Sequence, residues 1–291
     1  MGTMNIVCFG FGQVAKNFIK KLNNDGISFK LTTTSREETK YKKLDNIDYQ
    51  SFQFTEKSFD KNFIPKLENA DHILLSIAPT NEGDIVINKF QKYFKSKKIK
   101  WLTYLSATSV YGDHGGAWVK EASQTKPTSP KGIQRLKIEK QWMELANKFD
   151  LPFQIFRLSG IYSNQYNILT RLKSGEVKIV NKKSHFFSRI HVEDIANILY
   201  NSLNIFKKKE IYNISDDKPT SAEEVAMYGV KLLGVHKPKT IEVDEIESEM
   251  LKNFYKDSKK VNNKKMKKYF NYKLKFPTYI EGLNHISNHF I

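Results

Sequence analysis

The stretch Asn5-Ile-Val-Cys-Phe-Gly-Phe-Gly-Gln-Val-Ala15 joins a short apolar run to the start of a helical period through two closely spaced glycines. A strand, a glycine turn and a helix in this order are typical of the unit that opens a parallel α/β sheet. The single cysteine, Cys8, lies within the apolar run, where we expect a buried and inert thiol. This stretch sets the fold class expected for the rest of the chain.

The alternation of apolar runs and helical periods continues through the first 160 residues. The runs Ile73-Leu-Leu-Ser-Ile77 and Phe153-Gln-Ile-Phe156 are too apolar for strands with an exposed face, so both faces should be covered. Strands are expected at Asn5–Phe9, Ser28–Thr34, Tyr49–Phe54, His72–Ile77, Ile99–Leu105 and Pro152–Leu158. Helices are expected at Gln13–Leu22, Lys61–Asn69, Asp84–Phe94 and Ser129–Lys148. The sequence thus predicts an α/β fold with a Rossmann-type doubly wound parallel sheet.

Beyond Tyr162 the regular alternation gives way to shorter, mixed elements. Three helices are expected there, at Val192–Leu203, Ser221–Leu233 and Asn263–Phe270. We therefore divide the chain into residues 1–160, which carry the parallel sheet, and residues 161–291, a smaller C-terminal α/β lobe. The two parts should be interleaved, so the second is not an independent domain.

The net charge of the chain is strongly positive but comes almost entirely from lysine. The 291 residues include 48 Lys and Arg against 31 Asp and Glu, a formal charge of +17. Only positions 36, 135, 157, 171 and 189 are Arg, the residue that grips phosphates and bases bidentately. The densest basic stretch, Lys252–Lys275, follows an acidic run, Glu242–Glu249, that could partly neutralise it. We expect solvated lysines and no nucleic-acid partner; a nucleic-acid binder is the alternative that rests on charge alone.

The composition also bears on metals, membranes and compartment. One cysteine excludes an internal disulfide framework and a multi-cysteine zinc or iron–sulfur site, and we expect no metal. The longest apolar runs are far shorter than the ~20 residues that a membrane span needs. The first residues carry neither a charged leader nor a secretory apolar stretch. A cytoplasmic protein without a membrane partner is expected, as a monomer or a homodimer.

The glycine turn has the spacing of a dinucleotide-binding loop. Gly10 permits a tight turn, Gly12 lets the backbone approach a pyrophosphate, and the small Ala15 lets the helix pack closely on the strand. The N–H groups at the start of the helix then face the phosphates. The residues predicted to bind the cofactor here are Gly10, Phe11, Gly12, Gln13 and Val14. The alternative is a tight strand–helix turn without a ligand.

The end of the second predicted strand distinguishes the two nicotinamide dinucleotides. NAD sites place a carboxylate there for the ribose 2′-hydroxyl, whereas this chain reads Leu31-Thr-Thr-Thr-Ser-Arg36, with no acid before Glu37. Ser35 and Arg36 can instead bind the 2′-phosphate of NADP, Arg36 through its bidentate fork. NADP is therefore expected and NAD is less favoured; a solvent-exposed arginine is the structural alternative. At the end of the fourth predicted strand, Ser76 and Ala78 are also predicted to bind the cofactor.

Five motifs are spread over nearly the whole chain. They are Gly10–Ala15, Ser106-Ala-Thr-Ser-Val-Tyr-Gly112, Arg157-Leu-Ser-Gly-Ile-Tyr162, Arg189-Ile-His-Val-Glu-Asp-Ile-Ala196 and Tyr212-Asn-Ile-Ser-Asp-Asp217. Together they resemble the extended and atypical short-chain dehydrogenase/reductases, in the sugar-nucleotide epimerase/dehydratase branch. The string Tyr111-Gly-Asp-His-Gly-Gly-Ala-Trp-Val119 is similar to an atypical subgroup known mainly from bacterial genomes.

The resemblance implies an NAD(P)-binding domain over residues 1–160 and a substrate lobe over residues 161–291. It also implies an oxidoreductase or epimerase/dehydratase-like activity on a polar small molecule, nucleotide-linked or not. The catalytic pattern of the family does not carry over. Its members use Ser/Thr together with Tyr-x-x-x-Lys, with an acidic residue four positions beyond the Lys. Aligning that acid on Glu139 puts Arg135 at the Lys position and Lys131 at the Tyr position, and Val110-Tyr-Gly112 puts Ala107 at the Ser/Thr position.

Three residues are candidates for replacing that proton relay. Arg135 stays protonated, so it can hold the nicotinamide ribose or a substrate phosphate but not transfer protons. Lys131 lies one turn away, after the cap-like Ser129-Pro130, where a neighbouring cation and the positive helix end would ease loss of its proton. Ser106 can donate a hydrogen bond to a substrate carbonyl. The structural alternatives are a solvated lysine for Lys131 and, for Ser106, a buried strand-end hydroxyl satisfied by the backbone.

Four residues are candidates for the substrate site. His114 and Trp118 lie in a glycine-containing loop that could line a pocket, although loop geometry alone would explain the glycines. Tyr162 follows the sixth predicted strand, near where the resemblance places nicotinamide. Arg189 matches a family position that often faces sugar-nucleotide phosphates, with an ion pair to Glu193 as the alternative. The continuation after Tyr162 departs from the Gly-Pro-Gly of the family, which weakens the sugar-nucleotide assignment.

Two functions remain open at this point. One is an NADP-dependent oxidoreductase or epimerase-like enzyme that works without the family relay. The other is a non-catalytic NADP-binding sensor or regulatory protein, because the glycine loop is intact while all three relay positions are replaced.

Overall fold

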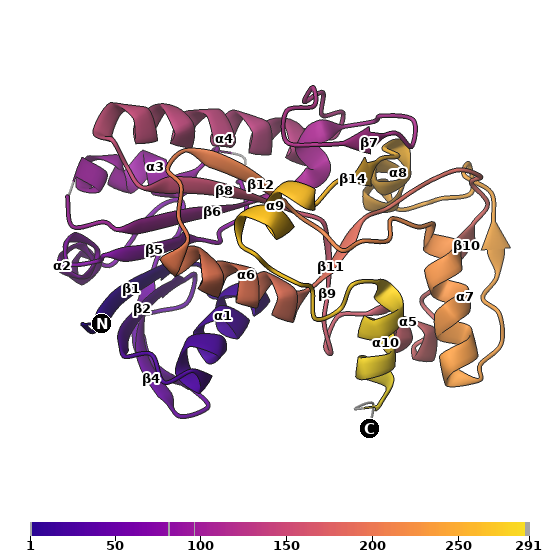
Figure 1. Cartoon of the computed structure of the whole chain (residues 1–291), viewed down its shortest axis with the longest axis horizontal. Helices are drawn as coiled ribbons and strands as arrows, with labels where there is room; N and C mark the ends of the chain where they lie inside the picture. The colour runs from indigo at the N-terminus through magenta and orange to yellow at the C-terminus, as the bar shows by residue number, and fades with distance from the viewer. Residues whose placement is uncertain (1, 81, 96, 289–291) are drawn as a thin grey trace. The chain divides into compact units, whose positions relative to one another are not determined.

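The principal element of the fold is an eight-stranded sheet. The computed structural model describes residues 2–80, 82–95 and 97–288, and orders the sheet β12-β8-β6-β5-β1-β2-β4-β3 (Figure 1). The strands are β1 (Met4–Phe9), β2 (Phe29–Ser35), β3 (Lys40–Leu44), β4 (Ile47–Gln53), β5 (His72–Leu75), β6 (Trp101–Ala107), β8 (Phe153–Leu158) and β12 (Glu210–Ile214). β4, β2, β1, β5 and β6 pair in parallel with their neighbours in that order. The predicted parallel sheet is confirmed.

Helices cover both faces of this sheet (Figure 1). They are α1 (Gln13–Asn24), α2 (Ile64–Glu68), α3 (Ile85–Phe90), α4 (Pro130–Phe149) and α6 (Val192–Asn204), with the 3₁₀ turns η1 (Lys61–Phe63) and η2 (Gln91–Lys95). On one face, Phe18 of α1 stacks on Trp101 of β6, whose indole N–H donates to Ser202 of α6. On the other, Phe90 of α3 and Trp142 of α4 join a large buried cluster. The predicted double winding is confirmed.

The edge strand β3 was not expected from the sequence. It runs antiparallel to β4, from the Lys40–Ser51 pair to the Leu44–Ile47 pair. It carries three lysines and the exposed Tyr41, so it lacks the apolar alternation by which strands are recognised. Charged side chains of this kind are typical of a sheet edge, where they discourage pairing with another chain. In the connection from β2 to β4, β3 occupies the place where a crossover helix is usual.

The chain forms two compact units. The first unit comprises residues 1–106, 134–157 and 195–212, and the second comprises residues 107–133, 158–194 and 213–291. The predicted division at residue 160 stays a prediction. The second unit contains β7 (Trp118–Val119), β9 (Gly160–Tyr162), α5 (Ile168–Lys173), β10 (Ile179–Val180), β11 (Arg189–His191), α7 (Ala222–Leu233), β13 (Thr240–Ile241), α8 (Glu249–Lys256), β14 (Lys260–Val261), α9 (Lys264–Tyr269), α10 (Tyr279–Asn288) and the 3₁₀ turn η3 (Thr108–Tyr111).

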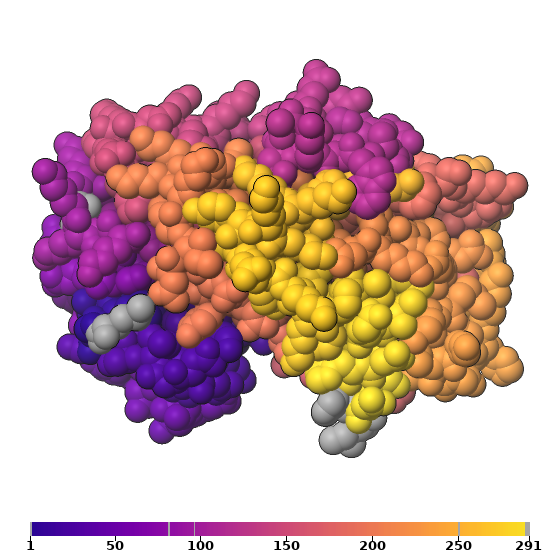
Figure 2. All heavy atoms as spheres, in the orientation of Figure 1, coloured from indigo at the N-terminus to yellow at the C-terminus, as the bar shows by residue number. Residues whose placement is uncertain are grey.

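Small residues allow the helices of the second unit to pack closely. Figures 1 and 2 show α10 beside α7, and Val225, Leu283 and Tyr162 belong to one buried cluster there. A side chain at Gly282 of α10 would place its Cβ 2.1 Å from the Tyr162 hydroxyl oxygen. Because so short a contact is forbidden, glycine is required at this position. The packing of α10 therefore depends on Tyr162 filling the space that Gly282 leaves.

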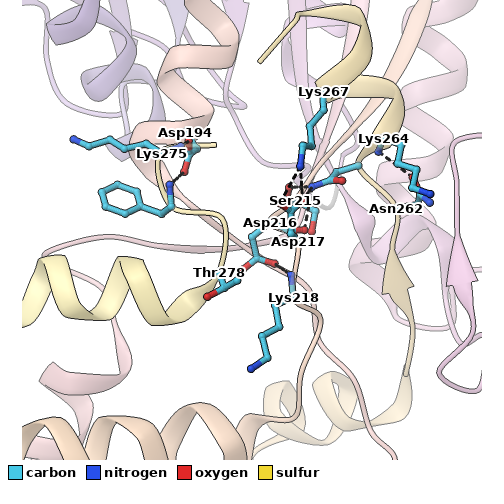
Figure 3. A network of polar contacts seen from close by, with 12 residues as sticks. Asp194, Ser215, Asp216, Asp217, Lys218, Asn262, Lys264, Lys267, Lys275 and Thr278 are labelled. Carbon is cyan, nitrogen blue, oxygen red and sulfur yellow. Dashed lines mark hydrogen bonds and ion pairs between the residues drawn. The ribbon is translucent and has the colours of Figure 1, made fainter. Parts of the chain in front are cut away.

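A polar network fixes the C-terminal segment within the second unit (Figure 3). The Asn263 amide donates to the carbonyls of Ser215 and Asp216, and to the Asp217 carboxylate at 2.8 Å. Lys267 pairs with Asp217 at 2.9 Å. Further lysines of the basic stretch pair with Asp257 and Glu193, while the acidic run supplies Glu249 to Lys252. Among the described ion pairs, the acidic run therefore neutralises the basic stretch only through the Glu249–Lys252 pair. The other paired lysines of that stretch have carboxylates from outside the acidic run as partners.

Two expectations from composition can be compared with the structure. Cys8 is fully buried in β1, and burial raises the pKa of its thiol, as expected for an inert cysteine. Over the described ranges, no helix is both long enough and apolar enough to span a bilayer.

Candidate functional site

The glycine turn between β1 and α1 is shaped by close approach of the loop after β5. Gly10 has a φ of +81°, and a Cβ there would lie 3.1–3.3 Å from atoms of Ile77 and Ser76. Its N–H donates to the buried Thr34 Oγ1 of β2 at 3.0 Å. Only glycine combines this left-handed conformation with so little space. The turn is therefore fixed at the carboxyl ends of three neighbouring strands.

The start of α1 is open, unlike Gly10. Gly12 is its N-terminal cap with an ordinary φ of −83°, and a Cβ there would meet no atom within 4 Å. No side chain caps this end of the helix, and its first turn has no acidic residue. A helix end of this kind favours an anion through its N–H groups and its dipole. The residues at this turn therefore fit the pyrophosphate of a dinucleotide.

The end of β2 is positively charged. Arg36 is exposed immediately after Ser35, the last residue of the strand. The nearest carboxylate, Glu37, pairs with Lys40 at 2.8 Å and Lys42 at 2.9 Å. Hydrogen bonds from these lysines lower the pKa of Glu37 to about 2. Glu37 is thus engaged by two cations, and with Glu38 the local balance is three positive charges against two negative.

The other predicted cofactor residues lie around the same turn. The Phe11 ring packs on Tyr49 of β4, with centroids 5.0 Å apart, and Val14 lies on the buried face of α1. The Ser76 N–H donates to the Phe9 carbonyl at 2.9 Å, which ties the loop after β5 to β1. Ala78 is exposed in that loop, and Gln13 begins α1. The structure thus gathers this set at the carboxyl edge of the sheet in the first unit.

Ser106, at the end of β6, is engaged by a buried ion pair. Its hydroxyl donates to Glu139 Oε1 of α4 at 2.5 Å. Glu139 also accepts three bonds from Arg157 of β8, from Nε to Oε1 at 3.0 Å and to Oε2 at 3.2 Å, and from Nη2 to Oε2 at 2.7 Å. All three residues are at most 3% exposed. The geometry favours the structural alternative for Ser106, with Glu139 rather than the backbone as its partner.

Arg135 and Lys131 lie one turn apart on α4. Arg135 Nη1 donates to the Leu105 carbonyl of β6 at 3.1 Å, which places its guanidinium near the carboxyl end of that strand. Lys131 is exposed in the first helical turn. Pro130 begins α4, and the Ser129 hydroxyl accepts from the Gly132 N–H at 3.2 Å. The predicted cap is confirmed; the roles of Lys131 and Arg135 stay predictions.

His114 and Trp118 lie in different surroundings within the second unit. The His114 Nε2 atom lies 3.2 Å from the carbonyls of Tyr111 and Gln124, so the ring is held by its own loop. Gly115 and Gly116 both have positive φ, as the loop-geometry alternative requires. Trp118 is 56% exposed on β7, which pairs with β14. The structure does not bring these two side chains to Tyr162 and Arg189 through any described contact.

Tyr162 and Arg189 do lie together, on the paired strands β9 and β11. Both line a cavity of about 720 Å³ whose walls come entirely from the second unit. The Tyr162 hydroxyl donates to the Thr278 carbonyl at 3.4 Å, and burial raises the pKa of this phenol. The alternative predicted for Arg189, an ion pair with Glu193, is wrong, because Glu193 pairs with Lys275 at 2.7 Å and lies near His285.

Sequence reasoning missed two parts of these sites. Glu139 served only to align a motif, and nothing in the sequence indicated that it would bind both Ser106 and Arg157. The aromatic wall of the cavity, Phe187, Phe254 and Tyr255, was also missed. The pair Phe186-Phe187 was a visible signal, but the partner rings come from a helix more than sixty residues further along.

Comparison with known proteins agrees with this arrangement. The model of the NAD dependent epimerase/dehydratase family matches residues 10–215. A functionally unknown conserved protein from Silicibacter pomeroyi is 30% identical over 99% of both chains, with a TM-score of 0.86. The dTDP-glucose 4,6-dehydratase of Bacillus anthracis, solved with NAD, is 18% identical over 98% of this chain and 96% of its own, with a TM-score of 0.78. The UDP-N-acetylglucosamine 4-epimerase of Bacillus cereus is 16% identical over 98% of each chain, with a TM-score of 0.75. No curated protein matches.

Proposed function

Because the chain belongs to the NAD dependent epimerase/dehydratase family, we propose that it is an NADP(H)-dependent oxidoreductase or epimerase-like enzyme acting on a small anionic substrate. One observation carries the proposal: the uncapped start of α1 lies at the same sheet edge as Arg36, and the nearest carboxylate is engaged by lysines. The substrate is assigned to the cavity that Tyr162 and Arg189 line.

The preference for NADP depends on residues of this chain. The related dTDP-glucose dehydratase was solved with NAD, so family membership alone does not select the phosphate-bearing cofactor. Arg36 can meet a 2′-phosphate with two parallel hydrogen bonds, and Lys40 and Lys42 add positive charge nearby. A carboxylate that would accept the 2′-hydroxyl of NAD is missing from the end of β2.

The chemistry divides between the cofactor and the protein. When bound, the nicotinamide ring exchanges a hydride with the substrate. Arg135 orients cofactor or substrate, since a guanidinium cannot release its proton. The Ser106 hydroxyl donates a hydrogen bond to Glu139, so we assign Ser106 a structural role. Lys131 is then the candidate that can hold and release a proton.

A second function, a non-catalytic NADP-binding protein, is favoured by one specific observation. The residues at the three relay positions are Ala107, Lys131 and Arg135, and the adjacent Ser106 is locked to a buried carboxylate. Of these groups, only the Lys131 amine can transfer a proton. If Lys131 is only a solvated surface lysine, the protein binds NADP but catalyses no reaction.

Turnover measurements separate the two functions. Hydride transfer from NADPH should be detected in a panel of carbonyl and sugar-nucleotide substrates. Lys131→Ala should lower turnover by about 10²–10⁴ with NADPH affinity unchanged, as expected for the loss of a general acid. Lys140→Ala, which removes an exposed lysine from the same helix, is the matched control and should have no effect.

Two outcomes would contradict the enzymatic proposal. If no substrate turns over although NADPH raises the melting temperature, the protein is the binding module. The triple variant Ala107→Ser, Lys131→Tyr, Arg135→Lys restores the family pattern, and activity appearing only there would confirm that the natural chain is silent. Turnover that survives Lys131→Ala would instead show that Lys131 is the wrong residue.

A further inference from the structure

The cavity of the second unit has predominantly apolar walls. Its apolar lining includes Ile168, Val177, Ile179, Leu251 and the aromatic rings of Phe187 and Phe254. The rings of Phe187 and Phe254 stack in parallel, with centroids 3.7 Å apart and planes 7° from parallel. Phe254 remains 45% exposed although it lies on this wall. A ligand that covered these side chains would remove a substantial apolar surface from water.

Several polar groups on the lining are already committed within the second unit. The Asn167 amide donates to the carbonyls of Ser163 and Asn164, and its oxygen caps α5 through the Thr170 N–H. The Tyr279 hydroxyl donates to Glu224 at 2.9 Å, and the Tyr162 hydroxyl donates to a backbone carbonyl. A nucleobase is recognised through hydrogen bonds to its edges, and these groups are not free to form them.

Arg189 has one fork of donors left for a ligand. Its Nη1 atom donates to the carbonyls of Phe187 and Thr220, and its Nη2 atom to that of Ser221 at 3.5 Å. A guanidinium has five N–H donors, so Nε–H and the second Nη2–H remain. In a guanidinium, Nε–H and the Nη2 hydrogen beside it are parallel, which is the geometry that binds a carboxylate bidentately.

The backbone and charge around Arg189 support this use. The Asp216 N–H and the Ser215 hydroxyl both donate to the Arg189 carbonyl, and the network of Figure 3 holds that loop through Asn263. Burial raises the pKa of Asp216 to about 8, against the opposing effect of Arg189. Burial thus disfavours the charged form of Asp216, and none of the described ion pairs joins this carboxyl to Arg189.

From this combination we propose that the cavity binds an amphipathic organic anion, with a carboxylate on the free fork of Arg189 and an apolar body against the Phe187–Phe254 wall. The other charged side chains on the lining are Arg171, Lys178, Glu176 and Glu223, two cations and two anions that balance each other. The inference rests on the proposed function and specifies its substrate class, which differs from the nucleotide sugars named for the related structures.

Calorimetric titration with hexanoate, octanoate and decanoate tests the proposal on the full chain. Each added methylene should tighten binding about fourfold, because a buried methylene contributes about 0.8 kcal/mol. Arg189→Met keeps an unbranched apolar stem and removes the guanidinium charge, so it should weaken decanoate about tenfold and leave decanol unchanged. Lys231→Met replaces an exposed lysine of α7 that does not line the cavity; it is the matched control and should change neither.

Titration of UDP-glucose and of NADPH completes the test. A dependence on chain length that persists in Arg189→Met, together with a preference for carboxylate over alcohol that this variant removes, would support the proposal. Binding of UDP-glucose more tightly than decanoate, or carboxylate affinities independent of chain length, would overturn it. NADPH should bind the native protein and Arg189→Met equally. If NADPH binds and no carboxylate does, only this inference fails; if NADPH does not bind, the proposed function fails.

Discussion

Replacing Glu139 by Gln is expected to lower the free energy of unfolding by about 3–5 kcal/mol. Glu139 lies on the buried face of α4 at 3% exposure, where it pairs with Arg157 and accepts a hydrogen bond from the Ser106 hydroxyl. The amide keeps the shape of the side chain but leaves the Arg157 cation buried without its counter-ion. Urea unfolding of native and variant protein, without ligand, measures the difference.

Two further variants show whether the loss comes from the buried charge. The double variant Glu139→Leu, Arg157→Met removes both charges and should recover much of the stability, because paired apolar residues often replace a buried ion pair without loss. Lys208→Ala breaks an exposed ion pair to Asp150 and should leave the unfolding midpoint unchanged. A Glu139→Gln variant as stable as the native protein would show that this ion pair does not hold α4 to β8.

Gly12→Val is expected to weaken NADPH binding about 100-fold or more, about 2.7 kcal/mol, while the unliganded protein stays folded. The added side chain meets no protein atom within 4 Å and the φ of −83° suits valine, so the fold should accept it. It would, however, occupy the space that the pyrophosphate needs at the start of α1. Fluorescence titration and a melting curve without cofactor measure the two effects.

Two glycine controls distinguish this steric effect from unfolding. Gly2→Val also points into open space, away from the turn, and should change neither binding nor stability. Gly10→Ala should lower the melting temperature even without cofactor, because its φ is +81° and its Cβ would crowd Ile77. If Gly12→Val binds NADPH as the native protein does, the dinucleotide does not lie at this turn.

The sheet could be predicted because its strands are buried on both faces. Runs such as Ile73–Ile77 have no other stable environment in a chain of this length, and the helices between them carry clear apolar stripes. β3 was missed because an edge strand can be lysine-rich and still pair through its backbone. The short strands of the second unit, such as β9 and β11, pair over three residues, too few for a periodic signal.

The cofactor turn could be predicted from the sequence for a reason that does not apply to the cavity. Gly10 to Ala15 act through their own backbone, so spacing alone carries the information. The surroundings of Arg189 depend on Phe187, Phe254 and the carbonyls of Thr220 and Ser221, which only the fold brings together. The expected Glu193 partner was plausible from helical spacing, yet Lys275 from the C-terminal segment takes that carboxylate.

The most direct test of the proposed function compares NADPH and NADH affinities for native protein and for Arg36→Ala, by calorimetry at one ionic strength. NADPH should bind the native protein about tenfold or more tightly than NADH, a difference of about 1.4 kcal/mol. Arg36→Ala should remove most of that preference and leave NADH binding unchanged, whereas Lys30→Ala, at the opposite end of β2, should preserve it. Equal affinities of the native protein for the two cofactors would contradict the assignment of Arg36 to the 2′-phosphate.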